Sequence, residues 1–369
     1  MIDKKNASVT PPNWKRAIVD QSLKSRIILR SKMINRIRQT FLANGFLELD
    51  TPVMVESTEF EPFFEPFVTY YKNKTGGEYR TYLVTSPEIK MKMAVSAGFG
   101  KIFQISKFFR NGDLSNRHNP EFMGLEWYET HTTYEEQMIF IENFIYQTSL
   151  DLTGPGLIYQ DTEFDLTPPW PRITFQELIY RHTGIDVLAN KNRTELYEAL
   201  KKLNIQGISE NNTWEELIEN LLVQKIDPTL GWRKPVFVIN YPNNCEFSLL
   251  AKSNRNNPAY VDRFELYIAG IEIADGFTEL DDPEEQQYRF KRTIRYMNKL
   301  KKQHIPAIPD DFLEALNYFP ETSGVAMGMD RLAMFFTNTT DIRDVLLFPF
   351  CEYFPEHKGQ EAALRKKDW

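Results

Sequence analysis

The sequence of 369 residues predicts an α+β fold in which an antiparallel sheet of about six strands is flanked by helices. Alternating apolar and polar residues predict strands within residues 81–130, 235–240 and 263–274. Apolar residues at helical spacing predict helices between them. Because the two patterns are interleaved along the chain, they favour one large domain over a string of separate modules.

The first predicted helix begins at Ser25. Four apolar residues recur at every fourth position, with Arg and Lys between them: Leu29, Met33, Ile37 and Phe41. Gly45 stands where a helix commonly ends, and residues 46–50 read as a short strand. Residues 1–25 are polar and contain two consecutive prolines, so we expect a loose N-terminal arm.

The middle and the end of the chain add further helices. Capping boxes at Thr174 and Thr213 precede apolar periodicity, so residues 174–226 predict a small helical insertion. Residues 81–130 read as strands with a single loop. A charged helix is expected over 283–303, and residues 322–349 read as a strand, a helix and a strand.

The composition bounds the classes of protein. Apolar residues make up 42% of the chain and the formal net charge is −7. No run reaches the ~18 apolar residues of a membrane span, so we expect a cytoplasmic protein without membrane contact. The two cysteines are too few for a disulfide framework or a structural zinc site. The acidic balance argues mildly against a general grip on nucleic acid but leaves room for a local basic patch. We expect no DNA partner, and we do not expect tRNA to be the main partner.

Residues 101–131 predict an antiparallel hairpin, because two alternating runs flank a polar loop. One face of the second run carries a ring, a carboxylate and a phenol, which suit a flat ring and an ammonium group: Phe122, Glu126 and Tyr128. Arg110 ends the first run beside His118 and Asn119, where its fork would grip a phosphate. The alternative is a solvated hairpin with a surface arginine.

Residues 263–280 predict a second hairpin that carries two carboxylates. Residues 268–271 read as a tight turn, which would pair Tyr267 with Glu272 and place Glu265 diagonally on the same face. Carboxylates about 7–8 Å apart across strands would share a divalent cation. The alternative is an acidic sheet face with solvated carboxylates.

Gly324, Ala326 and Gly328 alternate along the next predicted strand, so one of its faces carries little bulk. A ligand would lie directly on the backbone there. Asp330 and Arg331 then begin a helix whose N-terminus favours anions. The alternative is close packing of helix and sheet, which also uses small residues.

Together and in this order, these segments resemble the catalytic domain of the class II aminoacyl-tRNA synthetases and, within them, the lysyl branch. The helix from Ser31 with GFLELDTP, ending at Pro52, resembles motif 1 of that family. FRNGDLSNRHNPEF resembles motif 2, and GVAMGMDRL resembles motif 3. The segments TSPE (85–88), HNPEF (118–122) and RFELYIAGIEIADGFTEL (263–280) are similar to the lysyl-type signatures.

The resemblance implies an enzyme that uses ATP and Mg²⁺ to form an aminoacyl-adenylate. Arg110 would bind the α-phosphate, Arg331 would clamp adenine and the γ-phosphate, and these two are the candidate catalytic residues. The other implied nucleotide contacts are Asn111, Gly112, His118, Asn119, Phe122, Glu272, Ile273 and Gly328. Glu265 and Glu272 would hold the metal between phosphates.

The resemblance also implies a pocket for lysine. It would be lined by Ser86, Pro87, Glu88, Glu126, Tyr128, Asp275, Glu279 and Ala326. Several of these side chains are hydrogen-bond acceptors, as a buried ammonium group requires. No protein nucleophile is needed, because the family reaction works by positioning and charge neutralisation.

Two positions depart from the family pattern. Gly112, followed by Asp113, stands where motif 2 usually has glutamate. Asp275 stands where the family usually has asparagine, and a carboxylate there should repel a substrate carboxylate unless it is protonated or binds an amino group. Both changes leave the identity of the amino acid open.

Within the lysyl branch, several features resemble the ligases that attach (R)-β-lysine to a lysine of translation elongation factor P. Motif 1 begins close to the first residue, so we expect an arm over 1–25, a catalytic domain over 26–369 and no anticodon-binding OB domain. Ala326 stands where tRNA-charging lysyl enzymes usually have glycine. DLTPPWPR (165–172) and GFTELDDPEEQQYRF look closer to that paralogue. Motif 1 also implies a homodimer with Pro52 near the interface.

Two other functions remain open at this point. One is a synthetase-like enzyme with another acceptor, either tRNA or ammonia, although HNPEF and the acidic pocket disfavour an aspartate substrate. The other is a non-catalytic regulatory paralogue. Gly112 and Asp275 favour that alternative, whereas the presence of the residues with implied catalytic and metal roles disfavours it: Arg110, Glu265, Glu272 and Arg331.

Overall fold

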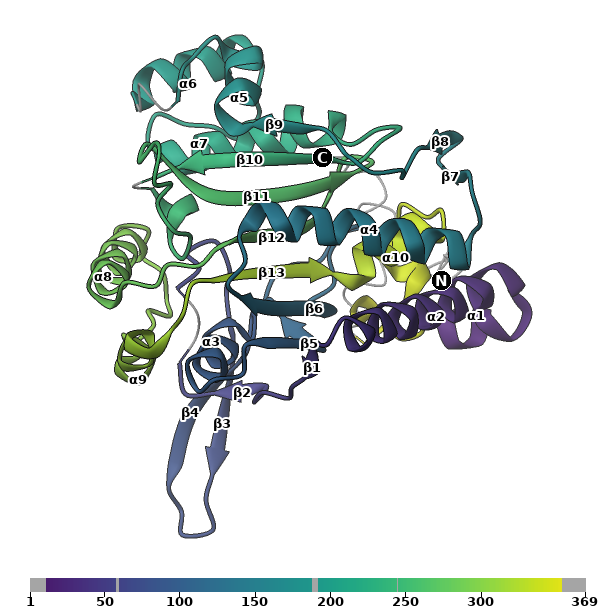
Figure 1. The fold of residues 1–369 in the computed structure, drawn as a ribbon, viewed down its shortest axis with the longest axis horizontal. Helices are drawn as coiled ribbons and strands as arrows, with labels where there is room; N and C mark the ends of the chain where they lie inside the picture. Colours follow the sequence, from purple (N-terminus) through teal and green to yellow (C-terminus); the bar gives the residue numbers. More distant parts are fainter. Residues whose placement is uncertain (1–10, 58–59, 188–191, 244, 354–369) are drawn as a thin grey trace, which may run out of the picture.

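An eight-stranded sheet forms the centre of the computed structural model (Figure 1). The structure describes residues 11–57, 60–187, 192–243 and 245–353. In order across the sheet, the strands are β1 (Leu47–Glu48), β5 (Lys101–Phe109), β6 (Glu121–Thr130), β13 (Thr322–Gly328), β12 (Ile271–Thr278), β11 (Tyr260–Ile268), β10 (Val236–Pro242) and β9 (Arg172–Thr174). The central strands β5 to β10 are antiparallel, and the edge strands β1 and β9 pair in parallel with their neighbours. The predicted α+β fold is confirmed, with an additional short strand at each edge.

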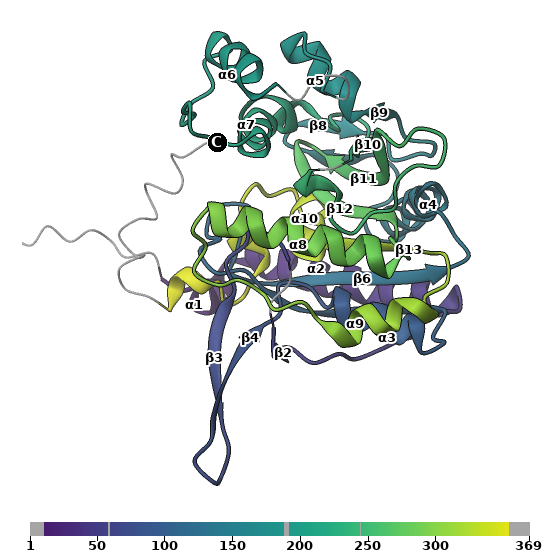
Figure 2. The same cartoon turned by 90° about the vertical axis from the view of Figure 1, so that its left-hand side faces the viewer.

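Helices surround this sheet, and two smaller sheets extend it. The helices are α1 (Asn13–Val19), α2 (Gln21–Ala43), α3 (Glu88–Ser96), α4 (Tyr134–Leu152), α5 (Phe175–Thr183), α6 (Arg193–Lys202), α7 (Trp214–Leu221), α8 (Pro283–Lys299), α9 (Asp310–Ala315) and α10 (Met329–Phe336). The smaller sheets contain β2 (Met54–Val55), β3 (Phe67–Lys72) and β4 (Glu78–Leu83), and β7 (Leu157–Tyr159) with β8 (Thr162–Phe164). The β3–β4 hairpin projects from the body of the molecule (Figures 1 and 2). No helix in the described part of the chain has the length and apolar content needed to cross a membrane.

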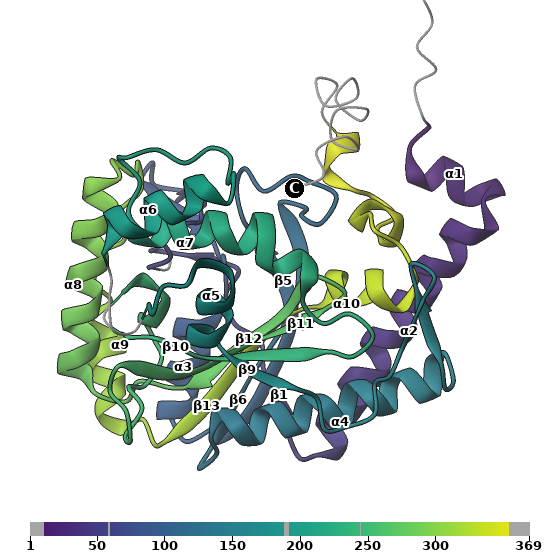
Figure 3. The ribbon, with the colours of Figure 1, turned by 90° about the horizontal axis from the view of Figure 1, so that it is seen from above.

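The two faces of the central sheet have different roles. Seen from above, α2 and α4 lie on one side of the sheet and α7 and α8 on the other (Figure 3). Along β6, Leu125 and Trp127 are fully buried against α2 and α4, and the ring of Trp127 packs on that of Phe41 at 5.2 Å. The alternate residues of β6 point to the opposite face, as a strand requires. That second face carries the candidate site.

Residues 174–226 fold as the helices α5, α6 and α7, which share a hydrophobic core with β10 and β11. The side chain of Thr213 forms the predicted capping box with Glu216. At Thr174 the side chain accepts from the Glu177 amide, which is the N-cap half of that motif. A π-helical turn, Leu222–Ile226, follows α7 and leads back towards the sheet.

The beginning of the described chain is helical, where a loose arm was predicted over 1–25. Helix α1 starts at Asn13, and α2 starts at Gln21 and runs on through the predicted helix. The carboxylate of Asp20 caps α2 by accepting from the first main-chain amides, which is a signal that the sequence carried. Residues 1–10 of the expected arm lie outside the described residues.

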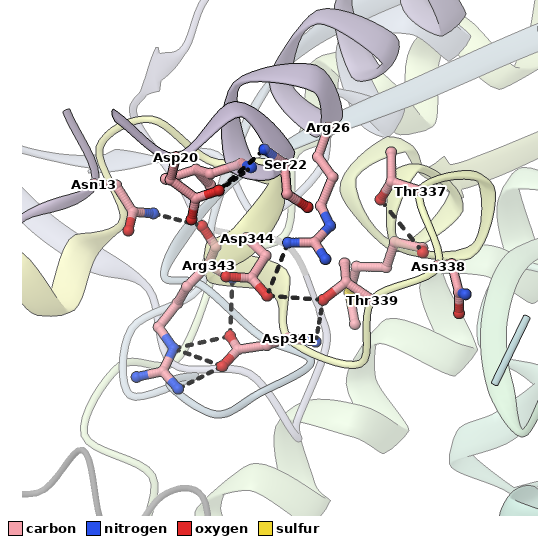
Figure 4. A network of polar contacts seen from close by, with 12 residues as sticks. Asn13, Asp20, Ser22, Arg26, Thr337, Asn338, Thr339, Asp341, Arg343 and Asp344 are labelled. Carbon is pink, nitrogen blue, oxygen red and sulfur yellow. Dashed lines mark hydrogen bonds and ion pairs between the residues drawn. The ribbon is translucent and has the colours of Figure 1, made fainter. Parts of the chain in front are cut away.

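Helix α1 is fixed to the end of the described chain (Figure 4). Asn13 is 2% exposed, and its amide donates to the main-chain oxygens of Arg343 and Leu346 at 2.7 and 2.8 Å. Arg26 of α2 forms an ion pair with Asp344 at 3.7 Å. These partners are more than three hundred residues apart along the chain, so sequence periodicity cannot reveal the contact.

Two further segments differ from the prediction. Residues 81–130 contain α3 as well as strands, and its apolar residues Met91 and Val95 show the i, i+4 spacing of a buried helix face. Beyond α10, the strand expected within 322–349 is absent from the described residues. Ile342–Val345 forms a 3₁₀ turn there, capped by Asp341, whose carboxylate accepts from the Arg343 amide.

Candidate active site

A cavity of about 370 Å³ opens on the face of the sheet opposite α2 and α4. Most of the predicted site residues line it: Ser86, Glu88, Arg110, His118, Asn119, Phe122, Glu126, Tyr128, Glu265, Glu272, Ile273, Asp275, Glu279, Ala326, Gly328 and Arg331. They come from β6, β11, β12, β13, α3 and α10 and from the adjoining loops. The three sequence segments therefore meet in one place, as the resemblance implied.

Arg110 presents a cation to this cavity. Its guanidinium carbon lies 3.7 Å from the ring centroid of Phe64 and 5.1 Å from that of Phe122. Its Nε is buried and has no hydrogen-bond partner among the described residues. Burial and the nearby Arg331 lower the pKa of Arg110, but an arginine side chain keeps its proton in proteins. A buried, fork-shaped donor with free capacity suits an anion such as a phosphate.

His118 holds the second arginine of the cavity in place. Arg331 Nη2 donates to His118 Nε2 at 2.5 Å, and Nη1 donates to the main-chain oxygen of Glu272 at 2.9 Å. Burial, together with the charges of Arg331 and Arg110, lowers the pKa of His118 to about 3. The ring is therefore neutral and can accept from Arg331, while Nδ1 pairs with Ser115 Oγ at 2.8 Å.

A few predicted contacts fall elsewhere. Three of the predicted residues are not part of the cavity wall: Pro87, Asn111 and Gly112. Asn111 and Gly112 form the exposed start of the loop between β5 and β6, and Pro87 is the residue before α3. Asn119 lines the cavity, but its amide nitrogen donates to the Glu121 main chain at 2.6 Å and its oxygen accepts from the Phe350 amide at 3.0 Å. Its side chain thus ties the loop to the end of the described chain.

The second hairpin has the predicted register at its tip. The pairs next to the turn are Tyr267–Glu272 and Ile268–Ile271. Ala269 and Gly270 have φ angles of 53° and 73°, and a type I′ turn needs positive φ at both positions. An irregularity after Leu266 then shifts the pairing, so that Glu265 stands opposite Asp275. No residue pattern in the sequence indicates this bulge.

Arg263, which the sequence analysis missed, neutralises Asp275. Its Nε and Nη2 donate to the two carboxylate oxygens of Asp275 at 2.9 and 2.8 Å. Nη2 also donates to Glu265 at 2.8 Å. The expected repulsion between Asp275 and a substrate carboxylate is thus largely offset. Arg263 precedes Glu265 by two residues on the same strand, so the alternation of faces was the available signal.

Glu265 and Glu272 are the predicted metal ligands, and both line the cavity. Burial raises the pKa of Glu265 to about 8, and this carboxylate also accepts from Tyr267 Oη at 2.8 Å. The side chain of Glu272 is 43% exposed and lies 3.4 Å from Arg331. Among the described residues there is no group of three or more His, Cys, Asp or Glu that would bind a metal alone. Two carboxylates nevertheless fit Mg²⁺ when substrate phosphates and water supply the other ligands.

Three buried or half-buried carboxylates converge in another part of the cavity: Glu88, Glu126 and Glu279. Glu126 accepts from Ser86 Oγ and from Tyr128 Oη, each at 2.7 Å. Burial raises the pKa of Glu126 to about 8, and the negative charge of Glu88 adds to this shift. Such a group gains a proton in an empty pocket and ionises when a cation arrives.

Lys92 is a further residue that the sequence analysis missed. Its side chain is 1% exposed, and its Nζ lies 2.6 Å from Glu88 Oε1 and 2.5 Å from Glu279 Oε2. The spacing of four residues between Glu88 and Lys92 on a helix was the signal that would have indicated the first of these pairs.

Gly324 and Gly328 lack a side chain for different reasons. A Cβ atom at Gly324 would lie 2.1 Å from Glu279 Oε1 and 2.4 Å from a ring carbon of Tyr128. The packing alternative therefore holds at Gly324. At Gly328 the nearest atom to such a Cβ is Arg331 Cδ, at an ordinary contact distance of 3.5 Å. Of these two glycines, Gly328 is therefore the one whose missing side chain leaves space for a ligand at the cavity wall.

Comparisons with known proteins agree with this arrangement. The family model described as tRNA synthetases class II (D, K and N) matches residues 13–352. A lysine–tRNA ligase of Pelotomaculum thermopropionicum is 36% identical over 335 residues, which are 90% of this chain and 64% of that protein. The lysine–tRNA ligase of Trichormus variabilis is 35% identical over 336 residues, again 90% of this chain and 58% of the relative.

This chain therefore spans about 60% of the length of these two relatives. A lysine–tRNA ligase of Dehalococcoides mccartyi is 32% identical over 346 residues, 93% of this chain and 68% of that protein. The family match covers nearly all the described residues and includes Arg110, Arg331 and the cavity glutamates at 88, 126 and 279. The chain thus belongs to the class II tRNA synthetases of the D, K and N group.

Proposed function

We propose that the chain is a cytoplasmic ATP-dependent ligase that activates lysine or (R)-β-lysine as an aminoacyl-adenylate and transfers it to a lysine of translation elongation factor P. The observation that supports the activation step is that one cavity contains both a cationic part and an acidic part. Arg110 and Arg331 offer cations for phosphates, and the glutamates at 88, 126 and 279 offer acceptors for ammonium groups. A positively charged amino acid would bind at the glutamates and a nucleoside triphosphate at the arginines, so that the two substrates would meet in this cavity.

In the proposed first step, a carboxylate oxygen of the amino acid attacks the α-phosphorus of ATP in line with the leaving pyrophosphate. The new bond joins that oxygen to phosphorus, and the bond from phosphorus to the bridging oxygen breaks. Arg110 would stabilise the charge that develops on the α-phosphate, and Phe122, beside it, would stack on adenine. Arg331, oriented by His118, would neutralise the outer phosphates. Mg²⁺ bound at Glu265 and Glu272 would add charge neutralisation at the phosphates.

In the proposed second step, the amine of an acceptor lysine attacks the carbonyl carbon of the adenylate, AMP leaves and the amine loses a proton. Two observations support a protein acceptor: the methyl group of Ala326 faces the cavity, and the segments around 165–172 and 276–290 resemble the elongation factor P ligases. The names of the curated relatives favour tRNA as the second candidate.

The test has two stages. Amino-acid-dependent ATP–pyrophosphate exchange is measured with α-lysine, (R)-β-lysine, aspartate and asparagine. We expect exchange with a lysine isomer alone, and no exchange with any of the four would contradict the proposal. Labelled amino acid is then offered with unmodified elongation factor P or with lysine tRNA. Label in the protein supports the acceptor proposed here, and label in the tRNA supports the second candidate.

Replacing Ala326 by glycine is expected to shift selectivity towards α-lysine. Ala326 pairs with Glu126 on one neighbouring strand and with Asp275 on the other, so its methyl group occupies the centre of the pocket wall. One methyl group in a binding pocket changes discrimination by about tenfold. The ratio of kcat/KM for (R)-β-lysine to that for α-lysine should fall by this factor, and an unchanged ratio would show that the methyl group does not set pocket size.

We expect a homodimer with Pro52 near its interface. Large apolar side chains are exposed on both sides of this residue: Leu42, Leu47, Val53 and Met54 are each between 44% and 51% exposed. Such a patch is typical of an interface. Sedimentation equilibrium at micromolar concentration should give twice the chain mass of 43.4 kDa. A mass of one chain, unchanged in Val53→Asp, would count against the dimer.

A further inference from the structure

Lys92 places an ammonium group directly behind the wall of the candidate amino-acid pocket. It lies on the second turn of α3 and is almost completely buried. Its Nζ bridges Glu88, one turn earlier on the same helix, and Glu279, which follows β12. Burial by itself would lower the pKa of Lys92, but Glu279 and Glu88 outweigh burial and the pKa is raised. The group therefore stays charged at neutral pH.

Lys92 does not itself line the cavity, whereas both of its partners do. It lies behind these two carboxylates and contacts Oε1 of Glu88 and Oε2 of Glu279. The other oxygen of Glu279 stands beside Gly324 on the cavity wall and has no hydrogen-bond partner among the described residues. One side of this carboxylate is thus held by the chain, and the other side is left for a ligand.

The charges around this part of the cavity can be counted. Facing one another are Glu88 and Lys92 of α3, Glu126 and Tyr128 of β6, and Glu279. Once an arriving cation has ionised Glu126, three carboxylates and one ammonium group leave an excess of two negative charges. A diamino acid brings two ammonium groups, so the residues present match that substrate class.

We propose that Lys92 is a positioning residue, which fixes the Glu88 and Glu279 carboxylates from behind and thereby makes the pocket selective for a diamino acid. This proposal rests on the proposed function and extends it. Without the lysine, two carboxylates that share one 2.5–2.6 Å partner would repel each other. One of them would take up a proton or turn away, and the pocket would lose charge that a substrate ammonium group needs.

The test compares Lys92→Met with Lys90→Met in the full-length protein. Lys90 lies on the same helix and pairs with Glu56 at the surface, where the side chains are 32% and 77% exposed. In ATP–pyrophosphate exchange with the lysine isomer that the wild type uses, Lys92→Met should raise the KM for the amino acid at least thirtyfold. The kcat and the KM for ATP should stay within about threefold of the wild type. Lys90→Met should leave all three values unchanged.

A second variant separates positioning from folding. Lys92→Ala leaves a hole of the shape of the lost side chain, so added n-propylammonium should restore the KM for the amino acid and n-propanol should not. An amino-acid KM in Lys92→Met that equals the wild-type value overturns the proposal. Variants that stay unfolded even with the amine, or that lose kcat and KM for both substrates together, also overturn it, because they assign Lys92 to the stability of α3. If the wild type exchanges neither lysine isomer, the proposed function itself is wrong, which is a distinguishable result.

Discussion

Replacing Arg110 by alanine is expected to reduce adenylate formation by about 10³-fold and to leave the protein folded. The guanidinium lies close to two aromatic rings at the cavity wall, and its buried Nε has no hydrogen-bond partner among the described residues. Its removal would therefore break no internal hydrogen bond at that atom. Nearby carboxylates and the two rings offset part of the cost of burying this cation. A bound anion would offset more of it, and this favours a role in phosphate binding.

Lysine-dependent ATP–pyrophosphate exchange and thermal unfolding measure the two parts of the Arg110 prediction. Arg110→Lys keeps the charge but loses the fork, so we expect an intermediate loss of about 10- to 100-fold. Lys107→Ala is the matched control on β5, the strand that ends just before Arg110, because Lys107 pairs with Glu121 at the surface, where the side chains are 39% and 48% exposed. Near-normal exchange in Arg110→Ala would show that this arginine does not bind the α-phosphate.

Local patterns were sufficient to predict the elements that build the cavity floor. Strict alternation identified the β5–β6 hairpin and placed Phe122, Glu126 and Tyr128 on one face, all of which line the cavity. The Ala269–Gly270 pair gave the tight turn and the register beside it. These features depend on neighbours within a few residues, where backbone preference and side-chain period act directly.

The parts that could not be predicted depend on partners far apart in the sequence. Asn13 is buried by residues more than three hundred positions later, and its polar side chain gives no local sign of this. The ion pair of Arg263 with Asp275 depends on a bulge in the register. The helical spacing of Lys92 and Glu88 is visible in the sequence, but nothing local indicates that Glu279, which follows β12, lies beside this lysine. In each case tertiary packing decided the environment of a charged or polar group.

Replacing Glu126 by glutamine is expected to raise the KM for lysine and to remove much of its pH dependence. The groups that face Glu126 are Ser86, Glu88 and Lys92, with Tyr128 and Glu279. Burial raises its pKa to about 8 in the empty pocket, so the carboxyl is mostly protonated at pH 7. Binding of an ammonium group favours the ionised form and releases a proton. The wild-type KM should therefore rise by about tenfold for each pH unit between pH 8 and pH 6.

Glutamine keeps the shape of the side chain but cannot ionise, so the KM of Glu126→Gln should be nearly independent of this titration. The difference in KM between variant and wild type is then largest at pH 8 and narrows towards pH 6, where the wild-type carboxyl is itself neutral.

In the unliganded protein, ionisation of Glu126 should lower stability, whereas in the complex it strengthens binding of lysine. A raised folded-state pKa costs the wild type stability as pH rises from about 4.5 to about 8, and Glu126→Gln escapes this loss. Exchange kinetics and thermal unfolding at pH 6, 7 and 8, with Glu121→Gln as the surface control on the same strand, measure both effects. A constant ratio of the two KM values across this range would show that Glu126 does not change its protonation when lysine binds.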